Sequence, residues 1–158
     1  MTISPLHIGN HSFNPDDELL LQQIGDLFSG SPVPEQVLPE FDRLVQNLIP
    51  FDRLVIAVYL NNGLQSELVH ISGDPIESFT PGTQHFQSEE VVRDWIEYRR
   101  GITNLDPDSV PGVKLVRSLS LDVDKYGFKS WMFVPIIWQD EMIGELLLRS
   151  YSEDAFQG

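Results

Sequence analysis

The sequence contains no cysteine. This absence excludes disulfides, thiol nucleophiles, thioether-linked cofactors and cysteine-ligated zinc or iron–sulfur sites. No segment reaches the roughly 18 consecutive apolar residues that a membrane-spanning helix requires. Residues 1–13 have neither the basic start nor the apolar core of a signal peptide. These absences favour a cytoplasmic protein.

Positive charge is also scarce, because 10 lysines and arginines stand against 24 aspartates and glutamates, a net charge of −14. Such a field repels nucleic-acid backbones and anionic membranes, so neither is expected as a partner of this domain. The densest basic group, Arg93, Arg99 and Arg100, is interpreted as the solvated side of a helix. The 158 residues, of which 41% are hydrophobic, suffice for one domain with its own core.

Two helices are predicted in the first third of the chain, after a flexible lead-in over residues 1–14. Asn14 and Pro15 form a helix start, and apolar residues at helical spacing extend this helix to residue 28. A second helix is predicted over residues 34–48, with Pro39 as an alternative start of its regular part.

Strands alternate with further helices in the rest of the chain. A β-branched strand at 53–60, the turn residues Asn61–Gly63 and a return strand at 64–72 form a hairpin pattern. The elements predicted after it are a short strand at 83–87, a helix from Ser88 to Arg100, a strand at 102–105 and a helix at 115–126 that ends at Gly127.

The closing segment holds two nearly continuous apolar strands, 130–138 and 142–151, joined by the polar turn 139–141. The short connection predicts an antiparallel hairpin, and the apolar character of both strands requires cover on both faces. Residues 152–156 have the pattern of a helix start. Because the sequence stops two residues later, we expect a fragment of a larger signalling protein, with its C-terminal helix truncated.

The order ααβββαβαββ predicts an α+β fold of layered type. Its central antiparallel sheet would have about five to six strands, with helices on both faces. The alternative is the related PAS architecture, which the two leading helices and the closing hairpin fit less well.

The closing segment resembles that of GAF domains, a family of sensory and regulatory modules. The residues that carry the resemblance are the apolar run that ends at Pro135, Met142-Ile143-Gly144, the strand from Glu145 to Leu148, and Asp154-Ala155-Phe156. Residues 102–106 resemble the strand that precedes the last internal helix of the family. The likeness implies a single GAF domain over residues 15–158.

The resemblance implies a sensory domain that binds a small molecule noncovalently and couples it to an output domain in the same chain. Such output domains are histidine kinases, nucleotide cyclases or transcriptional regulators. GAF domains bind cyclic nucleotides, tetrapyrroles, haem or metabolites. Others are ligand-free dimerisation or interaction modules, which is the alternative function here.

Covalent bilin attachment and the free-methionine-sulfoxide reductase activity of this family both depend on cysteines. Since this sequence has none, neither is expected. The chain is therefore not expected to be an enzyme, and its cofactor or ligand is left unassigned.

Seven residues are candidates for lining the ligand pocket that the resemblance implies: Tyr59, His85, Trp95, Asn104, Asp106, Trp131 and Phe133. The aromatic candidates have core packing as their alternative, and Asn104 and Asp106 have turn chemistry. Trp131 and Phe133 share strand parity and are predicted to face the same side. The four histidines show no ligand spacing within an ordered helix, so no metal site is predicted.

The irregular segment 73–108 is predicted to cover the pocket. We expect a neutral or weakly charged, partly aromatic ligand that stacks near Trp95 or Trp131. The first helix has a wide apolar arc, which predicts a homodimer or, equally, docking on the domain's own sheet. The members of this arc are Leu19, Leu20, Leu21, Ile24, Leu27 and Phe28.

Overall fold

The computed structural model describes residues 15–29, 34–77, 79–90, 92–93, 102–103 and 125–156. The chain divides into two compact units, a helical unit up to Ile49 and a sheet unit from Pro50 onward. No helix among the described residues is both long and apolar enough to cross a membrane. The lead-in predicted at residues 1–14 lies outside the described residues.

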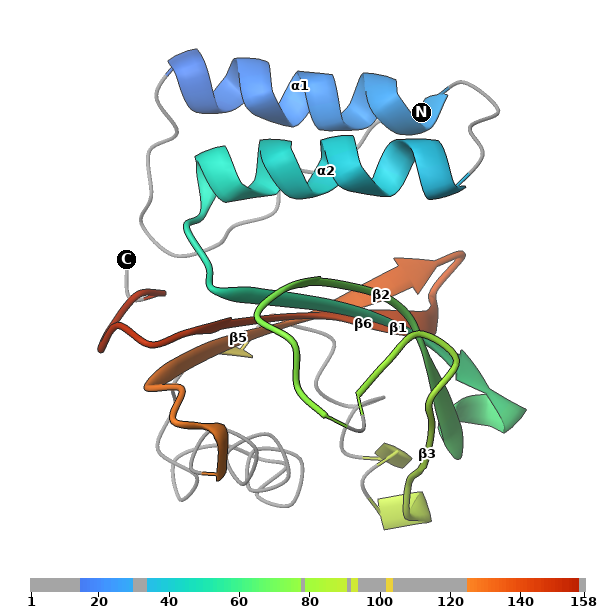
Figure 1. Cartoon of the computed structure of the whole chain (residues 1–158). Coiled ribbons are helices and arrows are strands. Elements are labelled where there is room, and N and C mark those ends of the chain that lie inside the picture. The colour runs from blue at the N-terminus through green and yellow to red at the C-terminus, as the bar shows by residue number, and fades with distance from the viewer. Residues whose placement is uncertain are drawn as a thin grey trace. The chain divides into compact units, whose positions relative to one another are not determined.

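The helical unit is an antiparallel pair, α1 (Pro15–Ser29) and α2 (Pro34–Leu48), as Figure 1 shows. Both sets of bounds agree with the sequence prediction to within one residue. In α2 the buried side chains are Val37, Leu44 and Val45, which lie on the apolar side that the helical spacing predicts.

The alternative start of α2 at Pro39 is wrong, because the helix begins at Pro34 and contains Pro39. Pro39 lies in the second turn of α2, beyond the first four N–H groups, so it removes the one backbone hydrogen bond that its N–H would donate to the carbonyl of residue 35. Burial of Val37 before the proline and of Leu44 after it outweighs that local cost.

The sheet unit contains six antiparallel strands in the order β3-β2-β1-β6-β5-β4 (Figure 1). The strands are β1 (Arg53–Leu60), β2 (Gln65–Gly73), β3 (Gln84–Phe86), β4 (Ile102–Thr103), β5 (Ser130–Trp138) and β6 (Glu141–Ser150). This sheet confirms the predicted α+β fold class. The first long strand, β1, pairs with the last strand, β6, so residues far apart in sequence meet at the centre of the sheet.

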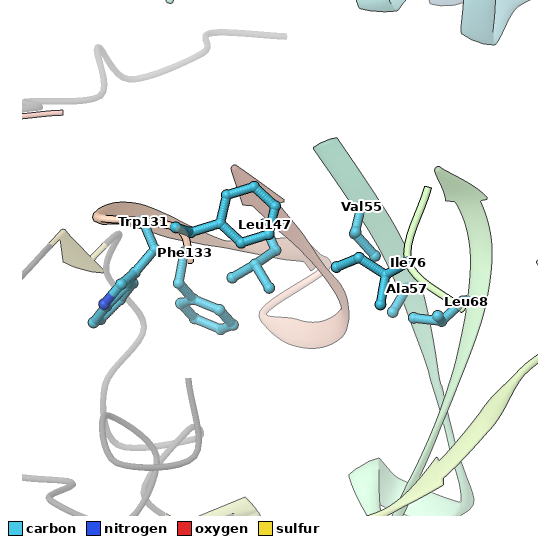
Figure 2. Packing of buried hydrophobic residues seen from close by; sticks show 8 residues of the cluster. Val55, Ala57, Leu68, Ile76, Trp131, Phe133 and Leu147 are labelled. Atoms are coloured by element: carbon cyan, nitrogen blue, oxygen red, sulfur yellow. The ribbon is translucent and has the colours of Figure 1, made fainter. Parts of the chain in front are cut away.

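One side of the sheet carries the main apolar core. We call it the Tyr59 face, because Val55, Ala57 and Tyr59 alternate onto it along β1. Figure 2 shows Trp131 and Phe133 of β5 on the same side, together with Val55, Ala57, Leu68, Ile76 and Leu147. The prediction that Trp131 and Phe133 face the same side is therefore confirmed.

The opposite side of the sheet is also apolar. Leu54 and Leu148 are register partners there and are almost completely buried. Met132, the partner of Leu148 in β5, is buried as well. Burial on both sides explains why strands β1, β5 and β6 read as continuous apolar runs instead of alternating ones.

Local signals placed several element ends correctly. The amide of Val92 donates to the carbonyl of Ser88, as expected for the predicted helix start, and Gly127 has the positive φ of 77° that suits a helix terminator. The helix start expected at 152–156 is wrong. The chain makes turns there, and the positive φ of 60° at Asp154 is incompatible with a continuing helix.

The β5–β6 turn holds two non-glycine residues in the left-handed region, Gln139 with φ 48° and Asp140 with φ 65°. Two-residue hairpin turns of this kind favour Asn-Gly. We expect the double substitution Gln139→Asn with Asp140→Gly to raise the free energy of unfolding by about 1 kcal/mol. Urea unfolding measures the change. Asp140→Ala, which retains a Cβ, should not stabilise, and a destabilised double variant would contradict this turn geometry.

Candidate functional site

A tyrosine and a glutamate form a hydrogen-bonded pair at the centre of the Tyr59 face. The Tyr59 hydroxyl donates to Glu145 Oε2 at 2.5 Å, across 86 residues of sequence. Strands β1 and β6 bring them together, since Ala57 is the register partner of Glu145 and Tyr59 lies two residues further along β1. Both side chains are half-buried. A polar pair thus lies among the buried apolar residues of this face.

The pair continues as a row of polar side chains across neighbouring strands. Tyr59 is the register partner of Ser66 in β2, and Ser66 is the partner of His85 in β3. Ser66 is only 2% exposed. The Nε2 atom of His85 is buried and has no hydrogen-bond partner among the described residues. Together with Glu145, this row places polar side chains from four adjacent strands on one face.

Aromatic rings border the polar row. Phe79 stacks on His85 with ring centroids 5.2 Å apart, and Tyr126 meets Phe79 edge-on at 6.1 Å. Tyr59, Phe79, Tyr126 and Met142 all pack against the buried cluster of this face. The arrangement combines apolar walls with a few polar groups, which is typical of small-molecule sites.

Burial changes the protonation of the central pair. It raises the pKa of the Glu145 carboxyl, against smaller opposite effects of the Tyr59 hydrogen bond and the Arg149 charge. Burial, with the negative charge of Glu145, also raises the pKa of the Tyr59 hydroxyl. Both shifts favour the neutral forms, which is the expected response of acids that are buried in apolar surroundings.

The raised pKa of Glu145 predicts a pH-dependent loss of stability. The unfolded carboxyl ionises near pH 4.3, whereas the folded one holds its proton to higher pH. The contribution of Glu145 to the free energy of unfolding is therefore fully present below the pKa of the unfolded carboxyl. It is lost as the pH rises through the pKa of the folded carboxyl. We expect Glu145→Gln to gain stability relative to wild type over that window, by about 1.4 kcal/mol per unit of pKa rise.

Urea unfolding of both proteins over a pH series measures this difference. Glu141→Gln, the same substitution at an exposed position of the same strand, is the matched control for the chemical change itself. A stability difference between Glu145→Gln and wild type that does not vary with pH would contradict the burial of the Glu145 carboxyl.

Two buried arginines lie side by side at one end of the same face. Arg53 and Arg149 are register partners and are 0% and 3% exposed. Arg53 Nη1 donates to the carbonyl of Asp74, and the guanidinium of Arg149 lies 5.8 Å from the centre of the Phe128 ring. Burial first, and then the neighbouring Arg149 charge, lower the pKa of Arg53.

Asp52 forms two hydrogen bonds at the same end of the sheet. Its Oδ2 atom accepts hydrogen bonds from Ser150 Oγ at 2.7 Å and from the amide of Tyr151 at 2.8 Å. These bonds join the start of β1 to the end of β6. The arginine pair and Asp52 therefore fit a structural role at the end of the sheet.

The described residues offer little sign of a site elsewhere. A hollow of about 340 Å³ in the helical unit is lined by Gln23, Asp26, Glu40, Arg43 and Leu44. It is open to solvent, and its one described ion pair joins Arg43 and Glu40 at 2.5 Å on the helix surface. No group of three or more His, Asp or Glu side chains in the described ranges could hold a metal ion.

The structure brings together four of the seven residues predicted for the pocket. Tyr59 belongs to the central pair, and His85 ends the polar row on the same face. Trp131 and Phe133 are 4% and 0% exposed and belong to the buried cluster, so core packing is their observed environment. Trp95, Asn104 and Asp106 lie outside the described residues, and their role stays a prediction.

Sequence reasoning missed two polar members of the site, Glu145 and Ser66. The signal for Glu145 was a single acid within an apolar strand. Ser66 carried no signal of its own, since serine is frequent in strands that are half exposed. Only the strand register places both beside Tyr59.

Comparison with known proteins rests on structure. No protein-family model matches the sequence, and no curated protein matches it. The phycoerythrobilin-bound GAF domain of a cyanobacterial phytochrome is 17% identical, with a TM-score of 0.60 over 90% of this chain and 83% of that one. The GAF domain of a phosphoenolpyruvate-protein phosphotransferase from Coxiella burnetii is 16% identical, with a TM-score of 0.58 over 86% and 78%.

The chain has the GAF fold. The same fold relates it to fRMsr of Staphylococcus aureus, solved in complex with its substrate. That protein is 19% identical, with a TM-score of 0.60 over 93% of this chain and 88% of the other. The resemblance noted in the closing strands of the sequence is thus confirmed at the level of the GAF fold.

Proposed function

We propose that this chain is a sensory GAF domain that binds a small molecule noncovalently on the Tyr59 face and couples its occupancy to an output domain in the same chain. The observation that carries the proposal is the Tyr59–Glu145 pair, half-buried at the centre of an apolar sheet face. An ionisable carboxyl buried in a purely structural core costs stability. A ligand that binds the Glu145 carboxyl gives a reason for its presence there.

Two of the structural neighbours support a binding role. The phytochrome GAF domain is solved with phycoerythrobilin bound, and fRMsr is solved with its substrate. A shared fold supports the capacity to bind and leaves the ligand open. Covalent bilin attachment through a thiol is not proposed, since the sequence has no cysteine. The same absence supports a non-enzymatic role in a cytoplasmic signalling protein, the setting that the resemblance implies.

A thermal-shift screen of metabolites tests the proposal. A ligand at about 100 times its dissociation constant adds about 2.7 kcal/mol of stability. His85→Ala should weaken a true ligand of this face, whereas Phe86→Ala, the next residue of β3 and 80% exposed, should not. A broad screen without any stabilising compound, or hits that bind both variants alike, would overturn the proposal.

The second candidate function is a dimerisation or interaction module. It is favoured by Leu19, which is 54% exposed on α1 within the apolar arc that the sequence predicts. We expect a homodimer by sedimentation equilibrium and a shift to monomer in Leu19→Glu. A wild-type protein that stays monomeric up to high micromolar concentration rules out a dimer of this chain.

A further inference from the structure

We propose that the Tyr59 face selects an organic cation, of the amidinium or aromatic ammonium type, and that Glu145 is the residue that binds it. This inference rests on the proposed function, because it names the ligand class of the same site. It narrows the neutral or weakly charged, partly aromatic ligand that the sequence led us to expect to a cation, and the reason is Glu145.

The Glu145 carboxyl can accept further hydrogen bonds. Its Oε2 atom is engaged by the Tyr59 hydroxyl at 2.5 Å. No donor to its other oxygen, Oε1, is found in the part of the chain that the structure describes. An ionised carboxylate can accept about four hydrogen bonds, including a pair from one planar cation. The tyrosine therefore fixes the orientation of the carboxyl and leaves acceptor positions that no described residue uses.

The Tyr59 face also offers apolar and aromatic side chains for the body of such a cation. The rings of Tyr59, Phe79 and Tyr126 and the side chain of Met142 all pack against its buried cluster. Aromatic faces attract cations through their negative quadrupole, and the attraction grows when water is excluded. A planar amidinium attached to a ring can use both the carboxylate and the apolar walls.

Long-range electrostatics act in the same direction. The net charge of −14 concentrates cations near the protein and repels anions. An anionic ligand would need the arginine pair, but Arg53 and Arg149 are 0% and 3% exposed. The arginines therefore do not form an anion site as the residues lie.

Binding of a cation also removes an energetic conflict within the face. Burial disfavours the ionised form of Glu145, and a cation placed against Oε1 favours it. The carboxyl should thus release its proton as the cation binds, wherever the pH lies below its folded pKa. Proton release is a readout that a merely structural glutamate would not produce.

Three probes with the same ring and different charge test the proposal: benzamidine, benzamide and benzoate. We expect benzamidine alone to raise the melting temperature of the wild type in a concentration-dependent way. In Glu145→Gln the apparent affinity should fall by about 10- to 100-fold, the range for a lost hydrogen bond to a charged group. Glu141→Gln, the exposed control on β6, should bind as the wild type does.

Calorimetry in two buffers of different ionisation enthalpy measures the proton release, which should disappear in Glu145→Gln. If that variant does not fold, Tyr59→Phe gives the second test: it removes the hydrogen bond that orients the carboxyl, so benzamidine should bind more weakly than to the wild type while its preference over benzamide and benzoate remains. Binding that is equal for benzamide or benzoate, benzamidine binding that survives in Glu145→Gln, or no benzamidine effect at all would overturn the cation proposal.

The outcomes that reject a cationic ligand differ from those that reject the sensory function. A neutral or anionic metabolite that binds the wild type and is weakened by His85→Ala would leave the sensory function standing and reject the cation class. If neither the metabolite screen nor the three probes give any binding, the sensory function itself fails.

Discussion

Phe133→Ala is expected to lower the free energy of unfolding by about 3–5 kcal/mol, the range for removal of a fully buried phenylalanine. The side chain is 0% exposed. It lies on β5 between its register partners Ile102 in β4 and Leu147 in β6. Truncation leaves a cavity that these strands can fill only by distorting the pairing of the sheet. Urea unfolding followed by circular dichroism measures the loss.

Phe86→Ala is the matched control, because it is the same substitution at a position that is 80% exposed. It should change stability by no more than about 0.5 kcal/mol. The comparison also decides between the two roles predicted for Phe133. A loss below about 1 kcal/mol would show that the ring borders an open site, since the transfer term for a fully buried ring exceeds that value.

Gly144→Ala is expected to cost about 3 kcal/mol, at the upper end for overpacking. A Cβ at Gly144 would lie 2.4 Å from the carbonyl oxygen of Ala57, an atom of the neighbouring strand's backbone. The contact cannot be relieved by a side-chain rotation. Strands β1 and β6 would have to separate, and their pairing is what brings Tyr59 to Glu145.

Gly82→Ala is the control for this change. A Cβ at Gly82 would meet nothing within 4 Å, although its φ of 88° is strained for alanine. The expected cost is about 1 kcal/mol from the backbone alone. Equal losses at both positions would contradict the close approach of β6 to β1, and a Gly144→Ala protein as stable as the wild type would do so more strongly.

The sequence was sufficient for the elements whose signals are local. The bounds of β1 were predicted as residues 53–60 from β-branched residues and the Asn-Asn-Gly turn that follows, and β5 was predicted over 130–138 in the same way. Continuous apolar runs correctly indicated a sheet buried on both sides. Local rules failed at Pro39, where burial on either side of the proline decided the outcome, and at Asp154, whose φ no pattern revealed.

The candidate site could be predicted only in part, because it depends on register between distant strands. Tyr59 and Glu145 are 86 residues apart and meet through the β1–β6 pairing. The side of the sheet on which a lone acid falls is set by this pairing. Arg53 and Arg149 were missed for the same reason, since each looks unremarkable in its own strand and only the fold makes them buried neighbours.

The most direct measurement of ligand binding at the Tyr59 face is an NMR titration of ¹⁵N-labelled protein with benzamidine and with the strongest stabiliser from the metabolite screen. We expect saturable shifts of the amides around Tyr59, Ser66 and Glu145, on three adjacent strands of one sheet. Shifts confined to the helical unit, or none at ligand concentrations that stabilise the protein, would contradict a ligand site on this face.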